Sequence, residues 1–370
     1  MYYRIFTTTL AVLLLGGLTQ ADVVVTKRGK IHSKGDIVYL GYRGLSFQRG
    51  RRPSVIAWSD IEDFDYKEVD PDWEDGNKHY SIGDWASALG AYRDCAANAE
   101  ARLVFKVESA FSVCLCLLQQ GNKKAALQQL RGWKHIDSRH TPAVYRILAE
   151  IATANKKFGN ARAQYVKIEA LPELPGATVL SAKLGLVKVD IAESKFGAAE
   201  AALGRIKARN DRAKDANTTA GIAVLRARIV ITSGADDRLD EVRRELEKVA
   251  ENLKGVDDAN RAAVYAALGD ILFKQGKPDE ARFPYMRVVC MYPEQSGHVA
   301  NCLLNAGQCF INLSRTVKET DKGKYAQYLT EGMKLLRECA RKYKNPQARK
   351  DYRQYKPEFE ALPKDDTAGD

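Results

Sequence analysis

The sequence has few of the residues that carry catalysis or metal binding. Five histidines are scattered through 370 residues, and His135 and His140 stand five apart, which suits neither an HExxH helix nor a zinc hairpin. Cys114 and Cys116 do not form a CxxC pair. No GxSxG elbow, phosphate-binding GxxxxGK[ST] loop or Rossmann glycine pattern occurs. The sequence therefore predicts a protein that is not an enzyme and holds no metal or cofactor.

Long apolar runs are absent after residue 21, so no transmembrane helix is expected there. Before that point, Arg4, the apolar run Leu10–Leu18 and the small-residue site Thr19–Ala21 are the three parts of a secretory signal peptide. We therefore expect residues 1–21 to be a signal peptide and the protein to be exported, to the periplasm or outside the cell. The alternative is an uncleaved segment that leaves the protein associated with a membrane.

Positive charge exceeds negative charge, with 58 Lys and Arg against 47 Asp and Glu, a net charge of +11. The excess is spread thinly, and two interpretations stay open: solubility, or a polyanionic partner such as acidic polymer or anionic lipid. The cluster Arg49, Arg51 and Arg52 has the same two interpretations, a solvated turn or a site for an acidic group. Nucleic acid is not expected as the partner of an exported protein.

The seven cysteines all fall inside helical patterns, which predicts small buried hydrophobic side chains. An oxidising compartment would permit a bridge among Cys290, Cys302, Cys309 and Cys339, but spacing does not assign one.

Residues 22–68 differ in character from the rest of the chain. Short β-branched and aromatic runs alternate with turns such as Arg28-Gly29 and Lys34-Gly35, which is typical of β hairpins. The expected strands are Val23–Thr26, Asp36–Leu40, Gly44–Gln48 and Ser54–Trp58. The run Trp58–Phe64 resembles the last strand of small SH3-like or Sm-like barrels, which implies a small β-barrel-like module. A module of about 45 residues has a marginal core, so we expect it to dock on the first helices.

The stretch Arg261–Pro293 holds two amphipathic helical patterns, the second of which begins at Pro278. Gly269 and Ala281 are small where two antiparallel helices must approach closely. In length and at these positions the segment resembles a tetratricopeptide (TPR) repeat, a hairpin of about 34 residues. One such hairpin cannot bury its own apolar face, so the resemblance implies that copies flank it.

The same pattern recurs from Pro71 onward. The small residue of the second helix recurs at Ala88, Ala126, Ala161, Ala199 and Ala281. Thr218–Leu253 fits one more unit by spacing, although it lacks that alanine. Val299–Leu313 starts a last unit, in which a polar insertion, Arg315–Lys324, is expected before the second helix. The prediction is a mainly α fold, a TPR-like α-solenoid of about six to seven helical hairpins after the β module.

The predicted domains follow from these patterns. Residues 1–21 are the signal peptide, 22–68 the β module, 69–346 the TPR-like helical-repeat domain, and 347–370 a C-terminal cap that gives way to a disordered tail.

Stacked hairpins form a groove lined by their first helices, and the resemblance implies that a peptide or partner helix binds there. The family's groove positions fall on Trp73, Asn77, Tyr80, Phe111, Arg146, Glu150, Lys188, Asp270, Phe273, Lys274 and Gln308. The N-terminal part is apolar and aromatic, and it is either covered by the β module or an open ligand site. The set does not match the Lys, Asn and Arg with which some TPR domains bind a terminal carboxylate.

The predicted function is thus a non-enzymatic scaffold that binds another protein, whose identity the sequence does not give. The alternative is an envelope-associated module that binds acidic polymer or anionic lipid. It would use the arginine-rich hairpin and the basic, tyrosine-containing segments Arg337–Lys344 and Arg349–Lys356.

Overall fold

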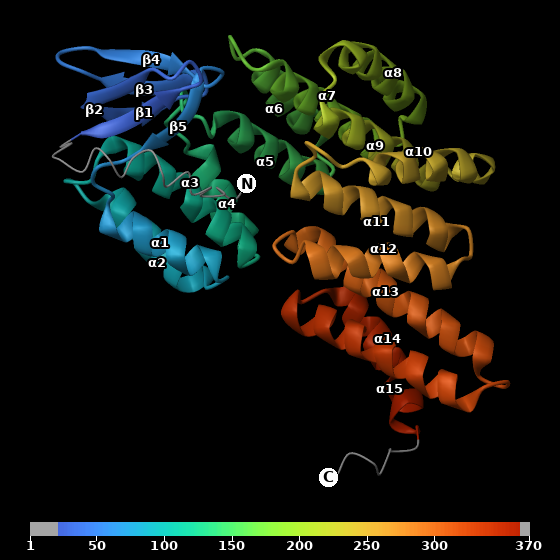
Figure 1. Cartoon of the computed structure of the whole chain (residues 1–370). Coiled ribbons are helices and arrows are strands. Elements are labelled where there is room, and N and C mark those ends of the chain that lie inside the picture. Colours follow the sequence, from blue (N-terminus) through green and yellow to red (C-terminus); the bar gives the residue numbers. More distant parts are fainter. Residues whose placement is uncertain (1–20, 363–370) are drawn as a thin grey trace. The chain divides into compact units, whose positions relative to one another are not determined.

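The computed structural model describes residues 21–362. The predicted signal peptide, except Ala21, and the end of the predicted tail lie outside the described residues. In the described part the chain is mainly α, with five strands followed by fifteen α-helices and one short 3₁₀ helix (Figure 1). The predicted fold class, a small β module before successive TPR-like helical hairpins, is confirmed. The chain divides into two compact units at Ala182/Lys183, and each is described by itself.

The first unit begins with a five-stranded antiparallel sheet, of strand order β4-β3-β2-β1-β5. The strands are β1 (Asp22–Thr26), β2 (Ile31–Leu40), β3 (Gly44–Gln48), β4 (Pro53–Ala57) and β5 (Ile61–Asp65). Each of the four expected strands overlaps one of these. β2 pairs with β1 through its first half and with β3 through its second half. Gly35 lies between the halves, where a Cβ would stand 2.4 Å from the Gln48 carbonyl oxygen, so only glycine fits.

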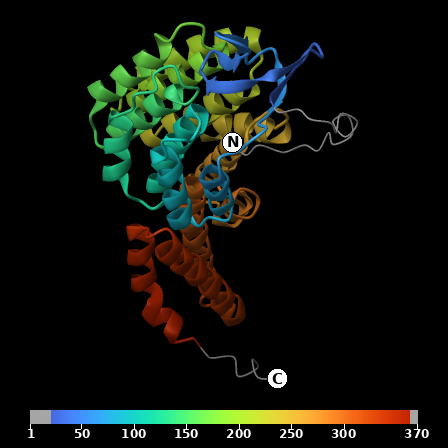
Figure 2. The same ribbon diagram turned by 90° about the vertical axis from the view of Figure 1, so that its left-hand side faces the viewer.

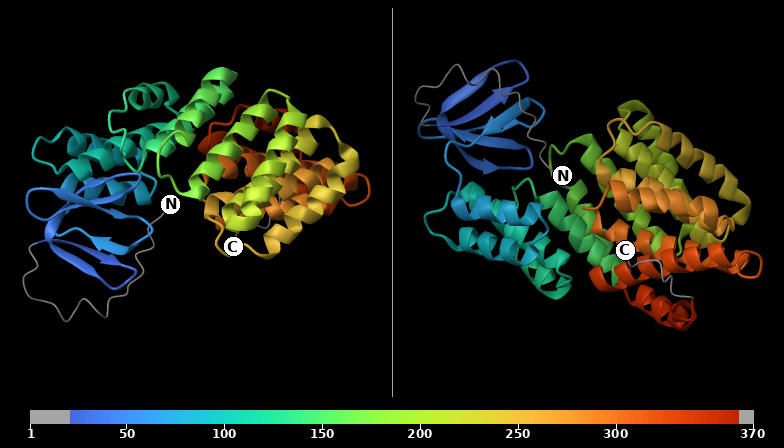
Figure 3. Two further views of the ribbon diagram at one scale, coloured as in Figure 1. Left: turned by 90° about the horizontal axis from the view of Figure 1, so that it is seen from above. Right: turned by 60° about the horizontal axis from the view of Figure 1, so that its bottom comes forward.

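The sheet packs on helix α3 (Leu103–Gln119), as expected for a module with a small core (Figure 3). Val24, Ile37 and Phe47 share one hydrophobic cluster with Val104 and Phe105 of that helix. The module therefore obtains part of its core from the helices that follow it.

A buried ion pair joins the same two elements. Asp22 is fully buried, and its carboxylate accepts hydrogen bonds from the backbone N–H of Ile37 at 2.6 Å and of Lys67 at 2.9 Å. The Arg102 guanidinium, just before α3, forms an ion pair with it. The carboxylate thus connects β2, the segment after β5 and the start of α3.

Six helices follow in the first unit: α1 (Pro71–Ser81), α2 (Trp85–Ala97), α3, α4 (Lys123–Arg131), α5 (Thr141–Ala154) and α6 (Phe158–Glu169). Side chains of Asp70, Asp84 and Asn122 cap the first, second and fourth of them by accepting from free backbone N–H groups. Three residues join α1 to α2, α3 to α4 and α5 to α6, as hairpins require, whereas a longer loop joins α4 to α5.

The remaining helices are α7 (Gly176–Ala192), which contains the division, α8 (Phe196–Ala213), α9 (Ala216–Ser233), α10 (Leu239–Glu251), α11 (Asp258–Lys274), α12 (Pro278–Met291), α13 (Ser296–Val317), α14 (Lys322–Lys342) and α15 (Pro346–Glu360). The 3₁₀ helix, Asp236–Arg238, precedes α10. α9 and α10 form the unit that was expected on spacing alone. They share one hydrophobic cluster with α11, to which α9 contributes Ala220, Ala223 and Ala227.

The expected polar insertion Arg315–Lys324 is wrong in its extent. α13 continues to Val317 and α14 begins at Lys322, so four residues connect them. Within this continued helix the hydroxyl of the buried Ser314 donates to the Ile311 carbonyl at 2.8 Å, which satisfies its polarity.

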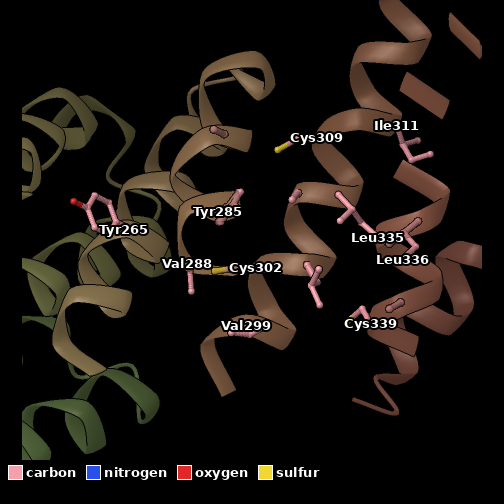
Figure 4. Close-up of a cluster of buried hydrophobic side chains, with 14 of the residues drawn as sticks. Tyr265, Tyr285, Val288, Val299, Cys302, Cys309, Ile311, Leu335, Leu336 and Cys339 are labelled. Carbon is pink, nitrogen blue, oxygen red and sulfur yellow. The ribbon is translucent and has the colours of Figure 1, made fainter. Parts of the chain in front are cut away.

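A tyrosine of the second helix packs on a glycine of the first in two hairpins. A Cβ on Gly76 would stand 2.6 Å from the ring of Tyr92, and a Cβ on Gly269 would stand 2.6 Å from the ring of Tyr285. Around Tyr285 the core continues through α12, α13 and α14, with Val288, Cys302 and Leu336 among its members (Figure 4). The small residues singled out in the sequence therefore do mark close helix contacts.

Candidate binding surfaces

The hairpin tyrosines also position two of the predicted groove residues. The Tyr92 hydroxyl donates to Asn77 Oδ1 at 2.8 Å, and the Tyr285 hydroxyl donates to Asp270 Oδ1 at 2.7 Å. Asn305 of α13 donates to the same Asp270 oxygen at 3.1 Å. Burial raises the pKa of Asp270, although these two hydrogen bonds act in the opposite direction. Asn77 and Asp270 are therefore held rigidly by their own hairpins.

At two N-terminal groove positions, Trp73 and Phe111, other side chains pack on the aromatic ring. Trp73 joins the core beneath the β module, with its ring 5.2 Å from that of Phe105 and 6.4 Å from that of Tyr66. Phe111 is 8% exposed and stacks on His140, from the loop before α5, at 4.2 Å. Phe111 is therefore buried, whereas Trp73 keeps part of its surface exposed.

Three other predicted residues of the first unit remain accessible. Tyr80 is half-buried and packs edge-on against Trp85, with ring centroids 4.7 Å apart. Arg146 and Glu150 lie one turn apart on α5 and are exposed. The part of the first unit open to a partner is therefore polar and of mixed charge.

The lysines predicted in the second unit are exposed and lie on different helices. Lys188 is on α7, where its charge, added to the larger effect of burial, lowers the pKa of His298. Lys274 ends α11 and lies 3.6 Å from the Asp236 carboxylate. That exposed ion pair is worth less than about 1 kcal/mol, so it would yield readily to a partner's carboxylate.

The last two predicted residues, Phe273 and Gln308, line a common cavity of about 220 Å³. Its other walls are Ile311 and Asn312 of α13 and Asp351 and Tyr355 of α15. α15 packs along the α13–α14 hairpin (Figure 2), and its side chains Asp351 and Tyr355 line this cavity. The sequence did not point to Asp351, because it is an isolated acidic residue in a segment dominated by lysine and arginine.

Cationic surfaces occur in both units. Arg49, Arg51 and Arg52 are exposed at the β3–β4 turn. Burial, followed by the charges of Lys30 and Arg49, lowers the pKa of His32, so positive potential extends from the turn onto β2.

A second cationic surface lies on α14. Lys334, Arg337, Arg341 and Lys342, together with Glu338, line a depression of about 510 Å³. The basic residues recur at helical spacing, so they share one face of the helix.

A buried polar cluster surrounds Glu108. Glu108 is 6% exposed, and its carboxylate accepts from Arg139 Nε at 3.0 Å and lies 2.9 Å from His140 Nε2. Burial alone would raise the pKa of Glu108, but hydrogen bonding and charge from His140 and Arg139 outweigh it and hold that pKa below its ordinary value. The cluster joins α3 to the α4–α5 loop. Because Arg139 N also donates to the Leu40 carbonyl, the loop is tied to β2 as well.

Residues 21–362 contain no disulfide and no cluster of metal-binding side chains. No group of three His, Cys, Asp or Glu side chains there is placed to hold a metal ion. Nor does that range contain a helix of the length and apolarity needed to cross a bilayer. The seven cysteines are all free, and burial raises the pKa of Cys302 and Cys309 to about 12. The bridge that the sequence left open is not formed.

Comparison with known proteins adds little to this geometry. No family model matches the chain, and no curated protein matches it. A tetratricopeptide repeat protein from Parabacteroides merdae aligns over 77% of this chain and 98% of its own, with 13% identity and a TM-score of 0.43. The TPR2AB domain of yeast Sti1 in its pHSP90 complex aligns over 77% and 97%, with 12% identity and a TM-score of 0.28. At these levels no family is assigned from them.

Proposed function

We propose that this chain is an exported, non-enzymatic scaffold that binds another protein along the first helices of its hairpins. The observation that carries the proposal is the convergence of Phe273 and Gln308, two predicted groove residues, on one open cavity. Asp270, which lies on α11 with Phe273, is already held in place by hydrogen bonds. A partner that contacts Asp270 therefore loses little binding free energy to the conformational entropy of this side chain. Rigid polar groups beside an apolar ring are what a specific protein contact requires.

The experiment compares charge-reversed variants in capture from an envelope extract of the source cell. Lys188→Glu with Lys274→Glu should lower the yield of the captured partner at least tenfold, because both lysines are exposed on first helices. The matched control reverses Lys207 and Lys254, two exposed lysines outside the predicted groove. Equal capture by both double variants would contradict the groove assignment.

Export is the second part of the proposal, and it is supported by the n-region, apolar run and cleavage site before Asp22. N-terminal sequencing of the protein from a cell that expresses the full chain should begin at Asp22. A cytosolic product that retains Arg4 would overturn export, and an envelope product that retains it would indicate an uncleaved anchor.

A second candidate function, binding to anionic lipid or acidic polymer, is favoured by the two cationic surfaces on the β3–β4 turn and on α14. It differs from the first in its salt dependence, because contacts to a polyanion weaken steeply as ionic strength rises.

A further inference from the structure

The cavity lined by α11, α13 and α15 contains a buried carboxylate, Asp351, that forms no ion pair with a basic side chain of the described residues. Asp351 is 7% exposed. Its Oδ2 accepts from Gln308 Nε2 at 2.9 Å, and its Oδ1 accepts from Gln347 Nε2 at 2.6 Å. Both donors are neutral amides. Within residues 21–362, no Lys, Arg or His nitrogen forms an ion pair with Asp351.

A charge in this situation is unusual. Aspartates are almost never so deeply buried unless a cation or metal pairs with them, because removal from water is costly. A carboxylate has about four acceptor positions, and the two amides use only two of them. Asp351 therefore retains acceptor capacity on the wall of an open cavity.

The other walls suit a cation rather than a neutral polar group. Phe273 and Tyr355 present aromatic rings, whose faces attract ammonium and guanidinium groups. Asn312 offers a side-chain carbonyl as a further acceptor. Tyr355 already interacts with one cation, since the exposed Arg315 guanidinium lies 5.1 Å above its ring and donates to its hydroxyl at 3.0 Å. Arg315 belongs to the rim and makes no ion pair with Asp351.

The size of the site sets the scale of the ligand. The cavity of about 220 Å³ exceeds the roughly 30 Å³ that one water occupies in the liquid, so it is more than a hydration site. A divalent metal would need several oxygen ligands, and no metal-holding cluster of acidic, histidine or cysteine residues is present among the described residues.

We propose that this cavity takes a single basic side chain, the ammonium of a lysine or the guanidinium of an arginine, presented by the partner protein, with Asp351 as its counter-ion. The inference deepens the proposed function and rests on it in one respect, that the partner is a protein. Phe273 and Gln308 belong both to the cavity wall and to the predicted groove, so a peptide lying along α11 and α13 would pass its opening.

The test titrates the full chain with N-acetyl-argininamide and with the uncharged, apolar N-acetyl-norleucinamide, while NMR follows the side-chain amides of Gln308 and Asn312. We expect the arginine probe to shift both amides and to bind at least tenfold more tightly than the norleucine probe. Asp351→Asn should weaken the arginine probe at least tenfold. The matched control Glu360→Gln, an exposed acid on the same helix, should leave binding unchanged.

Three results would overturn the inference. They are equal binding of the two probes, equal binding by wild type and Asp351→Asn, and tighter binding of free spermidine than of the arginine probe, which would indicate a small-molecule site. If Asp351→Asn does not fold, Asn312→Leu, at a half-buried position, is used for the same comparison. Partner capture separates this inference from the proposed function. If Asp351→Asn still captures the partner but the Lys188→Glu, Lys274→Glu double variant does not, the proposed scaffold function is retained. Only the inference that a basic side chain of the partner enters the cavity is then rejected.

Discussion

At the scale of single residues, the most informative contacts are those made by small or charged side chains at close approaches. Gly76 and Gly269 admit a tyrosine ring where any side chain would collide, and the tyrosine hydroxyl then fixes the neighbouring groove residue. Each glycine therefore allows the tyrosine to pack closely, and the packed tyrosine in turn holds a polar groove side chain in position. Substitution at these positions should affect both stability and binding.

Gly269→Ala should destabilise the protein by about 1–3 kcal/mol, because its Cβ would overlap the Tyr285 ring. The control is Gly204→Ala in α8, where no atom lies within 4 Å of the added Cβ. There the alanine should stabilise by about 0.5–1 kcal/mol through helix propensity. Urea unfolding measures both, and a gain of stability in both variants would contradict the close contact.

The Glu108 cluster predicts a loss of stability in acid. The folded-state pKa of Glu108 lies below its ordinary value, so its contribution is present above the unfolded-state pKa of about 4.3 and is lost as pH falls through the folded value. Glu108→Gln should therefore be less stable than wild type at pH 7, and the difference should shrink toward pH 3. Glu100→Gln, at an exposed site, is the control. A pH-independent difference would show that the charge of Glu108 is not involved.

At the scale of elements, the sequence predicted the helices and strands well. It predicted less well which groove side chains other segments of the chain pack on. Glycine-containing turns located the strands, and Pro278 marked the start of α12. The sequence left open whether Trp73 and Phe111 are covered, because the groups that pack on them, Tyr66 and His140, come from a linker and a loop that no repeat pattern describes. For Asp351 the local composition misled, since its basic neighbours face outward while it faces the cavity.

The attachment of the β module to α3 depends on the Asp22–Arg102 pair. Arg102→Met leaves a fully buried carboxylate without its cation and should cost about 3–5 kcal/mol. Asp22→Asn combined with Arg102→Met removes both charges and should recover part of that loss. Unfolding monitored by Trp58 and Trp73 fluorescence measures the effect. Equal stability of the single and double variants would indicate that the charge pair is not what secures the module.

At the scale of the whole molecule, the net charge of +11 is spread along the chain, and two local groups of basic side chains stand out, one at the β3–β4 turn and one on α14. A solvated surface and a polyanion site differ in a measurable way. Salt screens the attraction between basic side chains and a polyanion, so the affinity for a polyanion falls as the salt concentration rises. Basic side chains that serve only solubility bind no polyanion at any salt concentration.

If the second candidate function holds, the protein should bind phosphatidylglycerol vesicles at 50 mM salt and lose most of that binding at 300 mM. Replacing Arg49, Arg51 and Arg52 by alanine, or Arg337 and Arg341 by alanine, should each weaken it severalfold. Phosphatidylcholine vesicles are the control in a sedimentation assay. If the protein does not bind phosphatidylglycerol vesicles at 50 mM salt, the second candidate function is wrong and the positive charge serves solubility.

The uneven exposure of the cysteines has a practical consequence. Six of the thiols are buried, and Cys290 on α12 is exposed. A maleimide dye added to the native protein should therefore attach at one position, and a Cys290→Ser variant should remain unlabelled. Such a fluorophore would sit on the hairpin whose first helix supplies Phe273, close enough in the chain to report optically on whatever docks there.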